Sequence, residues 1–170
     1  MSRIEPLVTI PVGVVVERRK SMSRWADFVW RPVAVLPGVP DAAPWTALDG
    51  DADRGNFYAG AAAIALHRSD TSGYRDNLAH GAPLLWVVLR PTGGEPPYEI
   101  AAVTADPGEG EAFTESATDV VETVPMPEPV RATLAEFVAH HHVEHPFVKR
   151  RRDRPNPEAM APYAPSKRRK

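Results

Sequence analysis

The chain has no cysteine, and this absence removes several classes of chemistry. Without a thiol there is no disulfide, no iron–sulfur ligation, no thiolate zinc site and no cysteine nucleophile. No apolar run approaches the ~20 residues that a membrane helix needs, and Pro11 interrupts the continuous apolar stretch that a signal peptide would have. We therefore expect a soluble cytoplasmic protein with no membrane partner.

Motifs for nucleotide binding and for a serine nucleophile are also missing. Neither GxGxxG nor GxxxxGK[ST] occurs, and the segment 108–110 lacks a third glycine and carries a glutamate that would repel phosphate. There is no GxSxG sequence, and the serines lie in polar turns with no recognisable base: Ser21, Ser69, Ser72 and Ser116. The sequence therefore predicts no catalytic residue and no cofactor.

Charge is unevenly distributed along the 170 residues, although the net charge is only −2. Residues 149–170 hold nine basic and two acidic residues, a net of +7, and the other 148 residues hold 11 basic and 20 acidic, a net of −9. The basic segment has few large apolar residues, so burial cannot offset its ordering entropy. We predict a single domain over residues 5–148 and a disordered Arg/Lys/Pro-rich tail over 149–170.

Proline is abundant, at 19 of 170 residues, which argues against an all-helical bundle. The valines and isoleucine from Val8 to Val16 alternate strictly, as in a strand that Arg18 to Ser21 ends. Residues 84–89 are apolar on both faces and predict a central strand, and Pro32 predicts an edge or a bulge. The other expected strands are 28–36, 44–48, 57–66, 98–104 and 120–124.

Two helices are expected in the second half of the chain. Asp106 and Pro107 open a short one that runs to Phe113, and an apolar stripe predicts another from Glu128 until Pro146. The fold class is α+β: a mostly antiparallel, curled or barrel-like sheet with a C-terminal amphipathic helix and the basic tail.

Four of the six histidines lie close together, as His140, His141, His142 and His145. A helix would place His141 and His145 on one face, at a spacing that can bind zinc. There is no catalytic glutamate between them and no obvious third ligand, so we favour histidines that interact with the dipole at a helix C-terminus. No metal site is predicted.

Three aspartates alternate at Asp49, Asp51 and Asp53. Such spacing can chelate calcium, but the bidentate glutamate of a full calcium loop is missing. A solvated acidic turn is the favoured interpretation.

The polar and aromatic segment 66–78 precedes the most apolar strand. In one interpretation it is a recognition loop, with Tyr74 as the anchor and Arg68 and Arg75 as charge contacts. In the slightly favoured alternative it is a packed crossover, with Tyr74 closing the end of the sheet and Asn77 capping a turn. Elsewhere, Trp25 and Trp30 flank an early strand and are expected to be half-exposed core aromatics.

The basic run Lys149, Arg150, Arg151 and Arg152 has three interpretations. It could bind nucleic acid or anionic lipid, capture an acidic protein, or fold back on the acidic body. Because no aromatic residue interleaves the arginines and the body would repel a phosphate backbone, we favour an acidic protein partner over nucleic acid.

Several segments together resemble a known family. They are 11–19 followed by Trp25, 30–38, 66–68, 73–78, 83–90, 124–127 and 147–151, in order along the chain. They resemble the uncharacterised proteobacterial family named domain of unknown function 3305. The resemblance implies genes that neighbour those of molybdenum-dependent formate dehydrogenase and its maturation factors. Some members are labelled molybdopterin-guanine dinucleotide biosynthesis proteins, but the first strand here runs into Glu17 and basic residues rather than a glycine-rich nucleotide loop.

The leading hypothesis is a non-catalytic accessory domain that binds a protein. From the resemblance, the partner would be a formate dehydrogenase component or maturation factor, with Arg68, Tyr74, Arg75 and the basic run as contacts. The alternative is an enzyme or carrier that binds a nucleotide or pterin in molybdenum cofactor synthesis. It would hold phosphates with arginine side chains, namely Arg18, Arg19, Arg68, Arg75 and Arg90.

Overall fold

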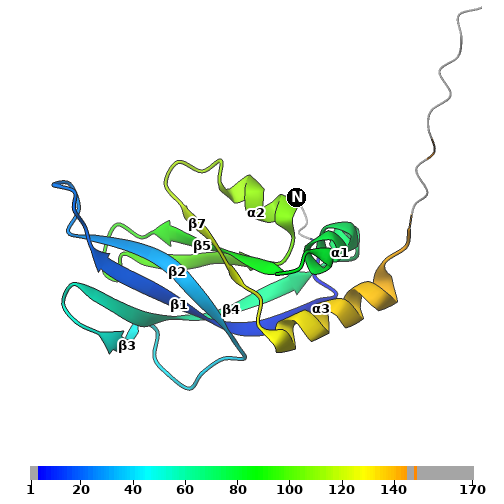
Figure 1. Cartoon of the computed structure of the whole chain (residues 1–170), viewed down its shortest axis with the longest axis horizontal. Coiled ribbons are helices and arrows are strands. Elements are labelled where there is room, and N and C mark those ends of the chain that lie inside the picture. The colour runs from blue at the N-terminus through cyan, green and yellow to red at the C-terminus, as the bar shows by residue number, and fades with distance from the viewer. Residues whose placement is uncertain (1–3, 145–147, 149–170) are drawn as a thin grey trace, which may run out of the picture.

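Seven strands form two antiparallel sheets in the computed structural model, which describes residues 4–144 and residue 148 (Figure 1). One sheet has the strand order β2-β1-β4-β3, and the other has the order β6-β5-β7. The strands are β1 (Val8–Lys20), β2 (Phe28–Pro37), β3 (Thr46–Gly50), β4 (Arg54–Leu66), β5 (Leu84–Pro91), β6 (Tyr98–Thr104) and β7 (Val120–Pro125). The predicted α+β class with mostly antiparallel pairing is confirmed, and the sheets do not close into a barrel.

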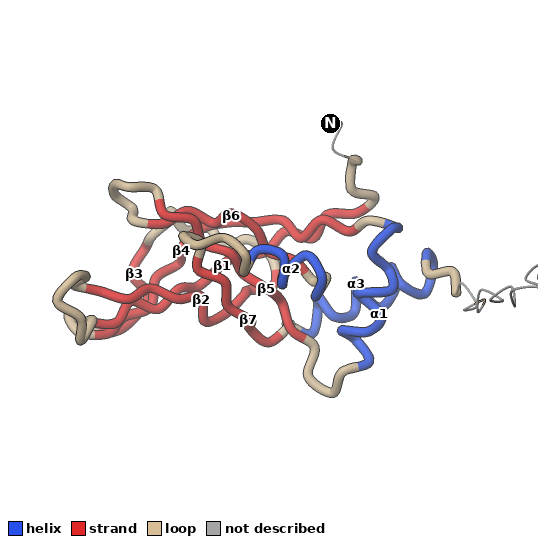
Figure 2. The backbone as a smooth tube through the Cα atoms, turned by 90° about the horizontal axis from the view of Figure 1, so that it is seen from above, coloured by secondary structure: helices blue, strands red, loops and turns tan. Residues whose placement is uncertain are grey.

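The helices are η1 (Arg68–Asp70), α1 (Thr71–Ala79), α2 (Pro107–Phe113) and α3 (Glu128–His141). Figure 2 shows α1 and α3 side by side at one end of the molecule, which we call the helical end. The turns after β1, β3 and β5 lie at the opposite end, which we call the hairpin end. None of the helices within residues 4–144 has the length and hydropathy that crossing a membrane requires.

The core lies between the two sheets and under the helices. Val12, Val14 and Val16 of β1 are fully buried with Val87 and Leu89 of β5. This is the result expected from their alternation, because side chains two residues apart share one face of a strand. As predicted, β5 is the central strand of its sheet. The hydrophobic alternation of β1 and the apolar residues on both faces of β5 thus specify how the two sheets face each other.

Local signals place several elements correctly. Pro32 lies on the edge strand β2, beside a register shift where Val15 pairs with Ala34 and Val16 with Pro32. Asp106 caps α2 by accepting hydrogen bonds from two backbone amides, and Pro107 occupies the first turn.

Two expectations about element boundaries are wrong. The basic residues from Arg18 do not end β1, which continues to Lys20 and pairs with both neighbours. The segment after β4 is not the recognition loop of the first interpretation, because Thr71–Ala79 forms helix α1, and the packed crossover of the alternative is therefore helical. The predicted tail 149–170 lies outside the described residues.

Candidate protein-binding site

Tyr74 belongs to the core of the helical end. Its side chain is 1% exposed and lies against Phe137 of α3. Its hydroxyl accepts a hydrogen bond from the amide of His67, and burial raises its pKa to about 12. A partner could not contact Tyr74 without rearranging the fold, so the packing interpretation describes it and the recognition-anchor interpretation does not.

Asn77 is a buried polar residue that joins α1 to the start of β5 and to the residue that follows β6. Its side-chain nitrogen donates to the carbonyls of Leu84 and Ala105, at 2.8 and 2.9 Å, and its side-chain oxygen accepts from the amide of Leu84 at 3.0 Å. It therefore satisfies backbone groups at the start of β5 and after β6, rather than capping its own turn.

Arg68 and Arg75 are exposed at the helical end, as a binding role would require. Arg75 donates to Glu144 at 3.1 Å and lies 3.1 Å from Nε2 of His142, so it ties α1 to the residues after α3. Arg68 lines a polar pocket of about 460 Å³ together with Ser69, Ser72, His140 and His141. Their role in partner binding stays a prediction, and the basic run 149–152 lies outside the described residues.

The histidines are distributed over different contacts at the end of α3. His140 bonds the carbonyl of Glu136, His141 packs on the ring of Phe137, and His142 lies 3.2 Å from the hydroxyl of Thr71. Within residues 4–144, no three carboxylate or imidazole side chains are grouped so that they could hold a metal ion. His145 lies outside the described residues.

The acidic turn 49–53 uses its carboxylates for its own structure. Asp51 accepts from the amides of Asp53 and Arg54, and these bonds lower its pKa. Asp49 accepts from the side chain of Asn56 at 2.8 Å. Both contacts fit the interpretation as a solvated turn.

The five arginines of the alternative hypothesis do not converge on one site. Arg18 and Arg19 lie at the hairpin end of β1, whereas Arg68 and Arg75 lie beyond the other end of that strand. At about 3.4 Å per residue, the length of β1 alone separates the two groups by roughly 35 Å. Arg90 forms a bidentate pair with Asp119, at 3.2 and 2.9 Å. A single phosphate site built from all five is therefore excluded.

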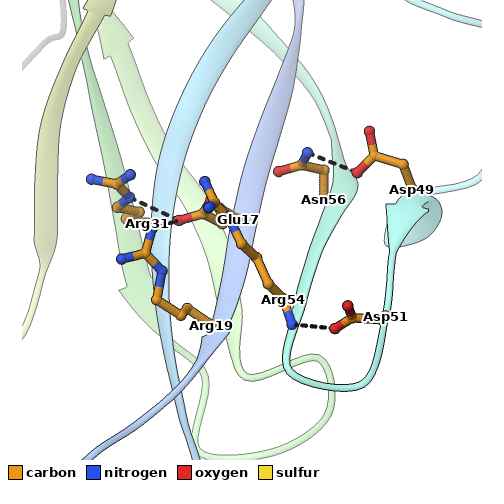
Figure 3. A network of polar contacts seen from close by, with 7 residues as sticks. All are labelled: Glu17, Arg19, Arg31, Asp49, Asp51, Arg54 and Asn56. Atoms are coloured by element: carbon orange, nitrogen blue, oxygen red, sulfur yellow. Dashed lines mark hydrogen bonds and ion pairs between the residues drawn. The ribbon is translucent and has the colours of Figure 1, made fainter.

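A buried carboxylate at the hairpin end is the feature that the sequence interpretation missed. Glu17 is 3% exposed and lies near the hairpin end of β1, an inner strand of the four-stranded sheet. Its strand register places Arg31 of β2 directly opposite, Arg19 two residues along β1 on the same face, and Arg54 of β4 opposite Arg19. Figure 3 shows the three arginine side chains around this one carboxylate. We call these four residues the Glu17 cluster.

The contacts within the Glu17 cluster are short and charge-assisted. Oε1 of Glu17 accepts from Nη2 of Arg19 at 3.2 Å and from Nε of Arg31 at 3.1 Å, and Oε2 accepts from Nε of Arg54 at 2.7 Å. Burial by itself would raise the pKa of Glu17, but the hydrogen bonds and charges of the arginines outweigh it and hold the pKa below its ordinary value. The cluster therefore ties together three strands at the base of the β1–β2 hairpin.

Beyond this cluster, the turn of the β1–β2 hairpin presents two large apolar side chains to solvent. Within this hairpin tip (residues 21–27), Met22 is fully exposed and Trp25 is 95% exposed. The tip has its own hydrogen bonds, from the amide of Ser21 to the carbonyl of Asp27 and from the amide of Trp25 to the hydroxyl of Ser23. The expectation that Trp25 is a half-exposed core aromatic is wrong, because the turn carries it away from the core.

A groove runs beside the Glu17 cluster and reaches the hairpin tip. It has a volume of about 280 Å³, and its lining includes Arg19, Lys20, Arg31, Met22 and Val29. Val29, like Met22, is exposed. Apolar and cationic groups thus lie next to each other on one side of the hairpin.

A second pocket at the hairpin end has aromatic walls. It measures about 390 Å³ and is lined by Arg18, Phe28, Trp30, Trp45, Phe57 and residues 95–97. The guanidinium of Arg18 stacks on Phe28 and Phe57, with 4.4 and 5.1 Å from its central carbon to the ring centroids. Trp30, predicted to be half-exposed, is partly buried here against Trp45. We call this the Arg18 pocket.

A family model for proteins of unknown function, DUF3305, matches residues 11–151. The chain belongs to the DUF3305 family. No curated protein and no solved structure matches it. The resemblance drawn from the sequence segments is thereby confirmed.

The DUF3305 match spans both ends of the molecule. It includes the Glu17 cluster, the hairpin tip and the Arg18 pocket, and it also includes Arg68, Arg75 and Lys149. The features of the hairpin end therefore belong to the family's domain and not to an appended segment.

Proposed function

We propose that this DUF3305 protein is a non-catalytic accessory domain that binds another protein through its hairpin tip. The proposal rests on one observation, the exposure of Trp25 at the end of an ordered hairpin, with Met22 beside it. Tryptophan, methionine and arginine are enriched in the buried centres of protein interfaces, whereas a fully exposed tryptophan on a free surface gains no stability for the fold.

The base of the hairpin makes this tip suitable for docking. The Glu17 cluster joins β1, β2 and β4, so the tip projects from a sheet that is held by charge-assisted bonds. A tip that is already ordered loses little conformational entropy when it binds, and this leaves more of the contact energy for affinity.

The proposed partner is a component or maturation factor of a molybdenum-dependent formate dehydrogenase. This choice rests on the resemblance described above, which implies genes beside those of that enzyme. The surfaces at the helical end, Arg68 and Arg75, and the basic run 149–152 would add contacts to the same partner, with the basic run facing acidic groups.

Co-purification from the native host tests the proposal. The tagged chain should recover a formate dehydrogenase component, and Trp25→Ala together with Met22→Ala should lower the recovery about tenfold or more, because loss of such anchors costs about 2 kcal/mol or more. Val39→Ala is the matched control, since it removes an exposed apolar side chain on the loop after β2, outside both the hairpin tip and the pocket that Arg68 lines. Failure to recover any such component, with residues 149–170 present or deleted, would contradict the proposal.

A second candidate function is binding of a nucleotide or pterin, and the Arg18 pocket is the observation that favours it. Its aromatic walls could stack on a planar ring, and a guanidinium could hydrogen bond to ring acceptors. Equilibrium binding of a guanine nucleotide or a pterin at micromolar concentration, weakened by Trp45→Ala, is the result that this alternative predicts. No binding of either compound at that concentration would dismiss it.

A further inference from the structure

The groove beside the Glu17 cluster has a local excess of positive charge. Three guanidinium groups surround one carboxylate, so the cluster carries a net charge of +2. Lys20 also lines the groove, and its contact with Asp53 is long, at 3.6 Å between two exposed side chains. An exposed ion pair of this kind is weak, and a better-placed carboxylate could displace it.

The arginines of the groove retain hydrogen-bonding capacity. Toward Glu17, Arg31 uses only Nε and Arg19 uses only Nη2, and neither makes another side-chain bond among residues 4–144. Their side chains are about half exposed, at 53% for Arg19 and 50% for Arg31. Because each guanidinium has five N–H donors in a planar fork, both present unused donors that match a carboxylate.

The apolar part of the groove lies within reach of these donors. Met22 and Val29 are exposed and line the same groove as Arg19 and Arg31. A ligand that fits must therefore carry an anionic group next to an apolar one. A protein segment with Asp or Glu beside a large apolar residue has this chemistry.

We propose that this groove binds an acidic, apolar segment of the partner protein, with a carboxylate on Arg19 and Arg31 and an apolar side chain on Met22 and Val29. This inference rests on the proposed protein-binding function and specifies the partner's surface. A single carboxylate would interact mainly with the charges that line the groove, where Arg19, Lys20 and Arg31 outnumber the one carboxylate of Glu17. A nucleic acid strand would extend over the acidic body, whose net charge outside residues 149–170 is −9.

Titration of the full chain with defined peptides tests the groove directly. The probes are the fluorescein-labelled peptide Leu-Glu-Glu-Leu-Glu-Glu-Leu and the same peptide with glutamine in place of each glutamate. NMR signals of the arginine Nε–H groups and of the Trp25 indole report which part of the chain is contacted. We expect the glutamate peptide to shift the Arg19 and Arg31 signals, and its affinity to fall as salt is raised.

Two substitutions separate recognition from folding. Arg19→Gln should weaken the glutamate peptide about five- to tenfold, while Arg31 and Arg54 still hold Glu17. Lys20→Gln is a second test that leaves the Glu17 cluster intact. Arg131→Gln is the matched control, because its only side-chain partner within the described residues is the exposed Glu128 at the start of α3.

The outcomes distinguish the groove from the proposed function. The groove inference is overturned if the glutamate and glutamine peptides bind equally well. It is also overturned if Arg131→Gln weakens the glutamate peptide as much as Arg19→Gln does. Either result holds even if Trp25 proves essential for partner recovery. Selective binding of the glutamate peptide that Arg19→Gln and Lys20→Gln both weaken supports the groove, whether or not a formate dehydrogenase component is recovered. A single-stranded DNA probe that binds the groove more tightly than the glutamate peptide would also overturn it.

Discussion

At the scale of single residues, Glu17 determines how the hairpin end is held together. It is a buried carboxylate whose negative charge offsets repulsion between three arginines on neighbouring strands. Removing one partner of a buried ion pair lowers the stability of a fold more than removing one partner of an exposed pair, because the buried charge that remains is no longer compensated. The stability of the hairpin end should therefore depend on the charge of this one residue.

Substitution of Glu17 by Gln should destabilise the fold at neutral pH by about 1–3 kcal/mol, because charge-assisted hydrogen bonds are replaced by weaker ones. Chemical denaturation measures the difference, and Glu136→Gln on the exposed face of α3 is the control. An unchanged free energy of unfolding would show that the cluster does not stabilise the sheet.

The same residue predicts a pH dependence. The folded-state pKa of Glu17 lies below its ordinary value of 4.5. Its contribution to stability is therefore present above pH 4.5 and is lost as the pH falls through the folded pKa. The difference in unfolding free energy between the natural chain and Glu17→Gln should shrink over that acidic range, whereas a constant difference would argue against the ion pairs as its cause.

The Glu17 cluster also shows which part of the site the sequence could not predict. Arg31 and Arg54 are 14 and 37 residues from Glu17, and only the register of three strands brings them together. A shift of one residue would turn these side chains to the other face of the sheet. The pattern Glu17-x-Arg19 within a continued β1 is the only local signal of the cluster.

At the scale of elements, the apolar patterns predicted strands better than they predicted helix α1. The alternation in β1 and the continuous apolar run in β5 identify both strands. In α1 only Tyr74 and Leu78 are large and apolar, so no helical stripe is visible, and a glycine lowers the helix propensity further. The buried hydrogen bonds of Asn77 are tertiary contacts that no local pattern can indicate.

Helix α2 offers a test of element packing. A Cβ atom on Gly110 would overlap the ring of Trp86 on β5, whereas one on Gly108 would make only ordinary contacts with Asp106. Gly110→Ala should therefore lower stability by about 1–3 kcal/mol through overpacking, and Gly108→Ala should change it little. Thermal denaturation of both variants checks this, and equal effects would show that α2 does not pack closely on β5.

At the scale of the whole molecule, the two ends have different characters (Figure 2). The helical end holds buried Tyr74 and Asn77 and the exposed arginines that the sequence suggested as partner contacts. The hairpin end holds Trp25 and Met22, which expose apolar surface, and the Glu17 cluster, which joins the strands beneath them. We expect the partner to engage the hairpin end first, because anchors of this kind contribute most of the binding energy of an interface.

Site-specific photocrosslinking in the native host tests this central claim most directly. A photoreactive phenylalanine analogue placed at Trp25 should form a covalent adduct with a formate dehydrogenase component. The same analogue at Glu136, on the exposed side of α3 at the helical end, should form less of this adduct than the analogue at Trp25. Adduct formation at position 136 without any at position 25 would contradict the account.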